Sequence, residues 1–372
     1  MKKTTQLLLT TILVVCLIGL GALAQEDRES SEEISSRVEV KGWKYVTDIS
    51  DQLLETTEFE SEPPYKIGYV TIFMANNWSV QMKREIMVEA EKHPDKVDEI
   101  IHLNAQSEIS EQISAVEDLV AQGVDAIVID PISPEALSGV LKMAQEEGVP
   151  VIGISSPIPV ENVTAWVGRD DVEYGRVIAK RLAEQLNYEG NVVALSGIAG
   201  NPVSARRWEG AKQVFDKYDD IEILTREFAQ WGFAQGKSAM SSILAGYSDI
   251  DAVWSGGGAM TQGAIEAFLD EGRDLVPMTG EANNGFMLDW VEYADQGFES
   301  IAFNNPTSHS AIGLRLALKA LNGEPIPKKV NVTAPYILTV EEAKKLSDSD
   351  LADGYWAGTM LDEEEIEELW GE

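Results

Sequence analysis

The chain has 372 residues, a formal net charge of −34 and one cysteine, Cys16. This length allows two ordinary domains with a sizeable core in each. So negative a chain repels phosphate backbones, which argues against a nucleic acid partner. Because Cys16 is the only cysteine, the chain has no internal disulfide bond, and thiol chemistry is excluded once the first residues are cleaved off.

Residues 1–24 have the features of a secretory signal peptide. A basic start, a mostly apolar stretch and a small-residue cleavage site are formed by Lys2, Lys3, Leu7–Leu23 and Ala22-Leu23-Ala24. An uncleaved membrane anchor is the alternative, although the apolar stretch is near the lower limit for spanning a bilayer. Val14-Val15 precedes Cys16 where a lipoprotein signal has a small residue, so lipid attachment at Cys16 is not expected. We expect a periplasmic or otherwise extracytoplasmic protein.

Residues 25–64 are polar, acidic and weakly periodic, and they end in Glu62-Pro63-Pro64. Such a composition predicts a flexible acidic tether, with at most a short helix around Asp51–Thr56. From Lys66 onward, strand-like and helix-like segments alternate, so the folded part is expected to begin there.

The next hundred residues alternate buried strands with amphipathic helices. Strands are expected at Ile67–Ile72, Val97–Leu103, Asp125–Ile129 and Val149–Ser155. Helices are expected to begin near Trp78 and to occupy Glu108–Gln122 and Pro134–Glu147. Near-continuous apolar strands joined by helices are typical of a parallel sheet that is covered on both faces.

The same pattern then starts again. Helices are expected at Val172–Leu186, Val203–Tyr218, Ala234–Ala245, Met260–Glu271 and Ser308–Leu321. Strands are expected at Asn191–Leu195, Ile221–Phe228, Ala252–Trp254, Leu275–Met278 and Phe298–Phe303. These are too many strands for one compact sheet, so the sequence predicts an α/β protein with doubly wound parallel sheets in two lobes.

The sequence carries no pattern that indicates catalysis, a metal or a cofactor. The histidines His93, His102 and His309 lack metal-ligand spacing. There is no nucleophile elbow and no phosphate-binding loop. Gly256-Gly257-Gly258 follows a strand but lacks the spacing of a dinucleotide site, and a tight turn explains it. Binding is therefore favoured over an enzymatic activity.

Hydrogen-bonding and aromatic side chains recur where the expected strands end. They are Asn76, Trp78, Ser155, Ser156, Gln230, Trp231, Glu281, Asn283, Asn304 and Asn305, with Arg207 in a helix after Gly197–Gly200. Taken singly, each has a structural alternative, such as a helix N-cap for Asn76 and a core position for Trp78. Gathered at the ligand-binding edge of parallel sheets, they indicate a polyhydroxylated small molecule held by amides and stacked rings.

Residues 66–340 resemble the periplasmic sugar-binding proteins of ABC importers, of the ribose-binding type. The markers are KIGYVTIFMANNW (66–78), GVDAIVIDPISPEAL (123–137), VPVIGIS (149–155), GIAG (197–200), RRWEG (206–210) and Asn304–Glu324. Each marker alone is weak, but their order and spacing are specific.

The resemblance implies ligand contacts at Asn76, Trp78, Ser79, Ser155, Ser156, Arg207, Trp231, Gly257, Glu281 and Asn304. Two departures from the ribose-binding pattern bear on the ligand. Ser155-Ser156 stands where ribose binders carry an Asp-Arg pair, and Gly257-Gly258 stands where they carry Asn-Asp. Charged contacts are thus replaced by small side chains, which indicates a bulkier ligand, or one recognised more by backbone groups and stacking.

The resemblance also implies two Rossmann-like lobes joined by three hinge crossovers, near Gly168–Asp170, Asn304–Pro306 and Ala334–Tyr336. Lobe one is expected at 65–169 plus 305–334, lobe two at 170–304 plus 335–360, and an acidic C-terminal tail at 361–372. The implied function is capture of a sugar or polyol between the lobes and delivery to an ABC permease in the membrane, by a monomer.

Three other functions compete with import. The same fold serves sensors that hand a sugar or signal molecule to a chemoreceptor or sensor kinase. A secreted enzyme on a related fold is disfavoured by the missing catalytic groups. The related transcription regulators are disfavoured because a signal peptide stands where their DNA-binding helices would be.

The acidity itself predicts a need for salt. Loss of Lys2 and Lys3 with the signal peptide takes the charge from −34 to −36, and the carboxylates are spread along the chain without a calcium-binding loop pattern. The screening length falls from roughly 30 Å at 0.01 M salt to roughly 3 Å at 1 M, so repulsion across a lobe should fade with salt. The melting temperature without ligand should therefore rise from dilute buffer to molar potassium chloride. A flat or falling curve would show that the charges are hydrated and individually worth little.

Overall fold

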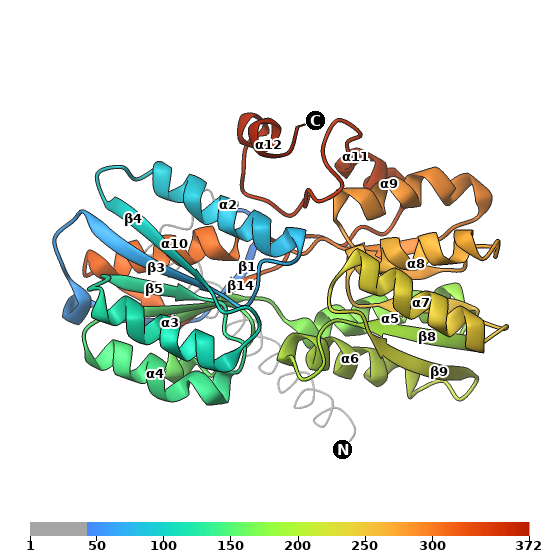
Figure 1. Cartoon of the computed structure of the whole chain (residues 1–372), viewed down its shortest axis with the longest axis horizontal. Coiled ribbons are helices and arrows are strands. Elements are labelled where there is room, and N and C mark those ends of the chain that lie inside the picture. The colour runs from blue at the N-terminus through green and yellow to red at the C-terminus, as the bar shows by residue number, and fades with distance from the viewer. Residues whose placement is uncertain (1–42, 372) are drawn as a thin grey trace, which may run out of the picture.

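The computed structural model describes residues 43–371. These residues form two α/β lobes side by side, each a mainly parallel sheet with helices on both faces (Figure 1). The expected two-lobed, doubly wound fold is confirmed. The expected signal peptide, Cys16 and the first part of the tether lie outside the described residues.

The first lobe contains a sheet with strand order β1-β14-β7-β6-β5-β3-β4. Its strands are β1 (Val46–Ile49), β3 (Tyr65–Thr71), β4 (Val97–Asn104), β5 (Ala126–Ile129), β6 (Val151–Ser155), β7 (Ala165–Gly168) and β14 (Lys329–Val332). One face packs on α2 (Asn77–Glu91) and α10 (His309–Leu321), the other on α3 (Ile109–Ala121) and α4 (Pro134–Glu146). β2 (Leu53–Leu54) and β13 (Ile326–Pro327) form a separate pair, and η2 (Val160–Asn162) precedes β7.

The second lobe contains a sheet with strand order β12-β11-β10-β8-β9. Its strands are β8 (Gly190–Ser196), β9 (Ile221–Phe228), β10 (Ala252–Ser255), β11 (Met278–Glu281) and β12 (Ser300–Phe303). Helices α5 (Asp171–Gln185) and α6 (Pro202–Phe215) cover one face. The other face is covered by α7 (Phe233–Gly246), α8 (Gly258–Asp270) and α9 (Asn284–Tyr293), which η3 (Ala294–Gln296) follows.

The chain passes between the lobes after β7, after β12 and after β14. The last passage brings Ile337 beside Ala302, with which it exchanges two backbone hydrogen bonds at the edge of the second sheet. Two helices follow, α11 (Val340–Leu346) on the second lobe and α12 (Glu363–Trp370) above α2 of the first (Figure 1). Among the described residues, no helix combines the length and apolarity needed to cross a bilayer.

The structure contradicts the expected tether over residues 43–64. β1 pairs with β14 and β2 pairs with β13, both antiparallel. The helix expected around Asp51–Thr56 is absent there, and η1 (Thr57–Phe59) follows instead. The physical reason is that Trp43 and Phe59 are buried, Trp43 in the core of the first lobe. A few well-placed apolar side chains anchor a segment whose average composition is that of a tether.

The acidic tail expected at 361–372 is also folded. The side chain of Asp362 caps the first turn of α12, and Trp370 at the other end is buried. Arg84 of α2 donates a hydrogen bond to the carbonyl of Leu369 and lies over the indole of Trp370, 4.1 Å from the ring centre. Trp370 therefore contacts α2 of the first lobe through Arg84 and also belongs to a core cluster of the second lobe, which anchors this acidic segment.

The sequence pattern missed β7 and α9 and displaced β11. β7 has only four residues, too few to show a period. α9 begins with Asn284-Gly285, a dipeptide that is typical of turns. β11 begins at Met278 because Pro277, just before it, has no N–H to donate to a neighbouring strand.

Close packing of α5 against α6 depends on two glycines. A Cβ atom on Gly175 would overlap the carbonyl oxygen of Arg207, and one on Gly210 would overlap the carbonyl oxygen of Val172. The two backbones are therefore nearly in contact. This contact sets Arg207 beside Asp171, the first residue of α5.

Gly175→Ala should destabilise the protein by about 1–3 kcal/mol, because the added methyl group forces α5 and α6 apart. The control is Gly139→Ala in α4, where a Cβ would meet no atom within 4 Å. That change should be neutral or slightly stabilising, since alanine favours a helix. Urea unfolding measures both, and equal stabilities would contradict the contact.

Candidate functional site

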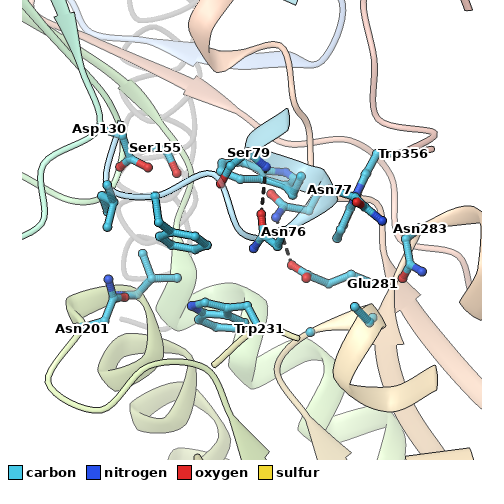
Figure 2. Close-up of a pocket in the computed structure, with 18 of the residues that line it drawn as sticks. Asn76, Asn77, Ser79, Asp130, Ser155, Asn201, Trp231, Glu281, Asn283 and Trp356 are labelled. Carbon is cyan, nitrogen blue, oxygen red and sulfur yellow. Dashed lines mark hydrogen bonds between the residues drawn. The ribbon is translucent and has the colours of Figure 1, made fainter. Parts of the chain in front are cut away.

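A cavity of about 340 Å³ lies between the two lobes (Figure 2). Its walls include the residues that end or follow β3, β5, β6 and β7 in the first lobe and β10 and β11 in the second. This is the edge at which parallel sheets bind ligands. Figure 2 shows Asp130 and Ser155 at one end of the cavity, Trp356 and Asn283 at the other, and Trp231 between them.

The loop after β3 supplies amides and an indole from the first lobe. Asn76 caps α2, because its Oδ1 accepts a hydrogen bond of 2.9 Å from the backbone N–H of Ser79. Trp78 is 9% exposed, and the guanidinium of Arg169 lies 5.5 Å from its ring centre. The helix cap and the core indole are thus both present, in residues that also line the cavity. The cap holds this loop in place at the cavity wall.

Arg207 of α6 is buried and held by two carboxylates. Its Nε donates to Oδ1 of Asp171 at 3.0 Å, and its Nη1 donates to Oε1 of Glu281 at 2.7 Å. Burial alone lowers the pKa of Arg207, but Glu281 and Asp171 outweigh it and raise the pKa above the usual arginine value. The guanidinium is therefore a fixed positive charge at the cavity wall, paired as a buried charge must be.

Arg169, directly after β7, extends this chain of charges into the first lobe. Its Nε donates to the same Oδ1 of Asp171 at 3.1 Å, and its Nη1 donates to Oγ of Ser155 at 3.3 Å. Burial lowers the pKa of Arg169 from its usual value, and Arg207 adds to this. Ser155-Ser156 stands where the ribose-binding pattern has an Asp-Arg pair. Arg169 brings a guanidinium to that place from the neighbouring strand.

Trp231 forms a wall of the cavity in the second lobe. Its φ of 59° lies in the left-handed region, which is unusual for a bulky residue and typical of residues held by their surroundings. A Cβ on Gly197 would overlap its ring, and one on Gly257 would lie 2.9 Å from its Cε3. The indole thus occupies space that a side chain at 257 would need. This gives a physical reason for glycine where the ribose-binding pattern has a polar residue.

Asp130 is a carboxyl group buried at the first-lobe end of the cavity. Its Oδ1 accepts a hydrogen bond of 3.1 Å from the backbone N–H of Ser156. Burial raises the pKa of Asp130 from its usual value of 3.8 to about 6, against the opposing effects of Ser156 and Arg169. Near neutral pH the ionised carboxylate can accept hydrogen bonds, and Ser156 and Arg169 offset only part of the free energy cost of burying its charge.

The charged groups at the cavity largely satisfy one another, yet they retain capacity for a ligand. Within residues 43–371, Nη2 of Arg169 and Nη2 of Arg207 have no hydrogen-bond acceptor, and Oε2 of Glu281 has no donor. Asp130 and the amide of Asn77 add further groups. Donors and acceptors are interspersed, which is the arrangement that hydroxyl groups require.

Most of the expected ligand positions meet at this cavity. Those that line it are Asn76, Trp78, Ser79, Ser155, Ser156, Arg207, Trp231, Gly257 and Glu281. Asn304 does not line it, and its side chain lies beside Gly358 of the C-terminal segment. The next residue, Asn305, lines the cavity instead and donates a hydrogen bond of 3.0 Å to Glu281.

Sequence reasoning missed other lining residues, among them Asp130, Arg169, Asn201, Asp353 and Trp356. Asp130 and Arg169 carry a usable signal, because each directly follows a strand. Asp353 and Trp356 carry none, because they come from the C-terminal segment, outside the strand–helix pattern. Over the described part of the chain, no cluster of three or more His, Cys, Asp or Glu side chains is arranged to hold a metal ion.

Comparison with known proteins gives consistent matches. Residues 67–325 match the family model described as a periplasmic binding protein domain. The ribose import binding protein of Bacillus subtilis is 28% identical over 278 residues, which cover 75% of this chain and 88% of that protein.

Two solved structures resemble the fold at 26% identity. A solute-binding protein from Bacillus halodurans with bound myo-inositol has a TM-score of 0.67, covering 77% of this chain and 98% of that one. An ABC transporter periplasmic solute-binding protein from Actinobacillus succinogenes with bound D-allose has a TM-score of 0.64, covering 76% and 99%.

In wild type, ionisation of Asp130 should lower the free energy of unfolding as the pH rises. Asp130→Asn should lack this decrease, because asparagine does not ionise. Below about pH 4, Asp130 is protonated in the folded and unfolded chains alike, and the stabilising contribution of its raised pKa is fully present. It is lost as the pH rises through about 6, because the buried carboxyl must then ionise, a loss of at most about 3 kcal/mol.

Urea unfolding from pH 4 to pH 8 measures this difference. Asp289, whose pKa burial raises to about 7, contributes a similar trend in both proteins. The informative quantity is therefore the wild-type value minus that of the variant. A difference that stays constant over this range would contradict the assignment.

Proposed function

Because this chain belongs to the periplasmic binding protein domain family, we propose that it captures a sugar or a related polyhydroxylated small molecule between its lobes. The observation that carries this proposal is a pair of indoles at one cavity, Trp78 in the first lobe and Trp231 in the second, each with a guanidinium over its ring. Indole faces can cover the C–H faces of a sugar, while guanidinium and carboxylate groups bind its hydroxyls.

The charges favour an uncharged ligand. Two guanidinium groups, Arg169 and Arg207, share the cavity region with the carboxyl groups of Asp130, Asp171 and Glu281. A phosphate or carboxylate ligand needs positive charge that is not already matched. The relatives named for ribose and solved with myo-inositol or D-allose support a neutral, polyhydroxylated ligand.

The family consists of binding proteins, and the chain is accordingly a binding protein rather than an enzyme. We propose that it works as a monomer outside the cytoplasm and delivers its ligand to an ABC permease. Ligand contacts to both lobes stabilise the closed arrangement, and this arrangement is what the permease recognises. Import is favoured over sensing because the Bacillus subtilis relative is named for import.

A thermal-shift and calorimetric screen with ribose, allose, arabinose, fructose, myo-inositol and xylitol tests the proposal. At least one of them should bind. Trp231→Ala should then weaken binding by about 1–3 kcal/mol through loss of a buried aromatic contact. Arg207→Lys should weaken binding about tenfold or more, because an ammonium group cannot reproduce the guanidinium fork.

Arg206→Lys is the matched control, since Arg206 is the exposed neighbour of Arg207 and does not line the cavity. It should bind like wild type. If none of these compounds binds, the proposal of a sugar ligand fails. If one binds equally well to Trp231→Ala, Arg207→Lys and wild type, the ligand lies elsewhere.

A further inference from the structure

The segment Leu351–Leu361, here called the C-terminal strap, lies beyond residue 325, where the family match ends. It runs between the lobes with a turn at Asp353-Gly354, from α11 on the second lobe toward α12, which rests on α2 (Figure 1). It is therefore a fourth passage of the chain between the lobes, in addition to those after β7, β12 and β14.

On one side, the strap is hydrogen-bonded to the second lobe. The backbone N–H of Asn284 donates to the carbonyl of Tyr355 at 2.8 Å, and that of Gly285 donates to the carbonyl of Asp353 at 3.0 Å. The side-chain amide of Asn284 also donates to the carbonyl of Leu351 at 2.8 Å. These bonds fix the strap to the start of α9.

On the other side, two buried residues of α2 hold the strap to the first lobe. Gln81 accepts from the backbone N–H of Trp356 at 2.8 Å and donates to its carbonyl at 2.9 Å, much as a neighbouring strand would. Glu85 accepts from Oγ1 of Thr359 at 2.7 Å. Gln81, Glu85, Trp356 and Thr359 are fully or almost fully buried, so these bonds are not readily exchanged for bonds to water.

The side chains of the strap alternate between the two lobes. Trp356 belongs to the core cluster of the first lobe, whereas Tyr355 and Ala357 belong to a core cluster of the second. Glycines permit the close approach: a Cβ on Gly354 would overlap the amide of Asn77, and one on Gly358 would lie 2.9 Å from the carbonyl oxygen of Asn305. The strap thus fills the space between the lobes beside the crossover at Asn304–Pro306.

The strap also reaches the cavity. Asp353 and Trp356 line it, and Figure 2 shows Trp356 at the end opposite Asp130 and Ser155. The indole N–H of Trp356 is buried without a hydrogen-bond partner in the described structure. Trp356 is therefore a third indole at the cavity, in addition to Trp78 and Trp231.

We infer that the C-terminal strap ties the two lobes together and forms an end wall of the ligand site, where Asp353 and Trp356 select the ligand. The selection rests on the proposed function, whereas the tie between the lobes does not. Opening of the cavity must break the bonds of the strap to Gln81 and Glu85 or those to Asn284. The strap therefore narrows the range of lobe arrangements before any ligand binds.

Distances between spin labels test the tie without a ligand. Labels on Glu117→Cys in α3 and Glu209→Cys in α6, both exposed positions, report the separation of the lobes in a Cys16→Ser chain. Gln81→Ala should broaden the distribution toward longer distances, because it removes both bonds to Trp356. Gly358→Ala, which pushes the strap away from Asn305, should do the same and serves as a second variant if Gln81→Ala fails to fold.

Gln112→Ala is the matched control. Gln112 is also fully buried and also pairs with the backbone in both directions, with Asp130 and Ile132, but only within the first lobe. It should lower stability and leave the distance distribution unchanged. Distributions in Gln81→Ala and Gly358→Ala that match wild type would overturn the tie.

Selection is tested with the variants Trp356→Phe and Asp353→Asn. For each variant, the dissociation constants for ribose, allose and myo-inositol are measured, and the ratios between ligands are compared with those of wild type. At least one ratio should change by about tenfold, the scale of discrimination from one altered pocket contact. Trp370→Phe, on α12 away from the cavity, should leave all ratios as in wild type. Unchanged ratios in both strap variants would overturn the selection. If wild type binds none of the three compounds, the proposed selection among them is overturned. The distance measurement needs no ligand and still tests whether the strap ties the lobes together.

Discussion

The buried chain of charges Arg169–Asp171–Arg207–Glu281 is the constraint on which the site depends. It begins after β7 in the first lobe, passes through the first residue of α5 and through α6, and ends at β11 in the second lobe. Removing one member leaves a partner charged, buried and unmatched, at a cost of about 3–5 kcal/mol. The glycine contact between α5 and α6 and the position of β11 are therefore tied to the geometry of the cavity.

This arrangement also explains how the protein departs from the ribose-binding pattern. The pattern places an Asp-Arg pair at 155–156, and here Ser155-Ser156 holds these positions while Arg169, directly after β7, donates to Ser155 at 3.3 Å. The pattern places a polar side chain at 257, and here the indole of Trp231 occupies that space. In both cases another residue occupies the space of the missing side chain, and the cavity has guanidinium groups beside flat rings.

The C-terminal strap adds to this frame a contact that binds both lobes at once. Three crossovers alone allow two lobes to hinge, because a few loop residues can absorb the backbone rotation. The strap places buried hydrogen bonds and apolar side chains between the lobes, beside the cavity. The proposed roles in closure and ligand selection would then fall to some of the residues that also stabilise the protein.

The sequence by itself determined the α/β class, the two lobes and most of the strand-end residues at the cavity, because apolar runs and helical periodicity are local properties that the chain carries in order. It failed where local composition misleads, as in the acidic stretches that Trp43 and Trp370 anchor. Only the tertiary structure decided that Asn305 rather than Asn304 faces the cavity, that Arg169 completes the charge chain, and that Trp356 closes one end. These depend on contacts between distant residues, such as Gln81 and Trp356, 275 positions apart, which no local pattern encodes.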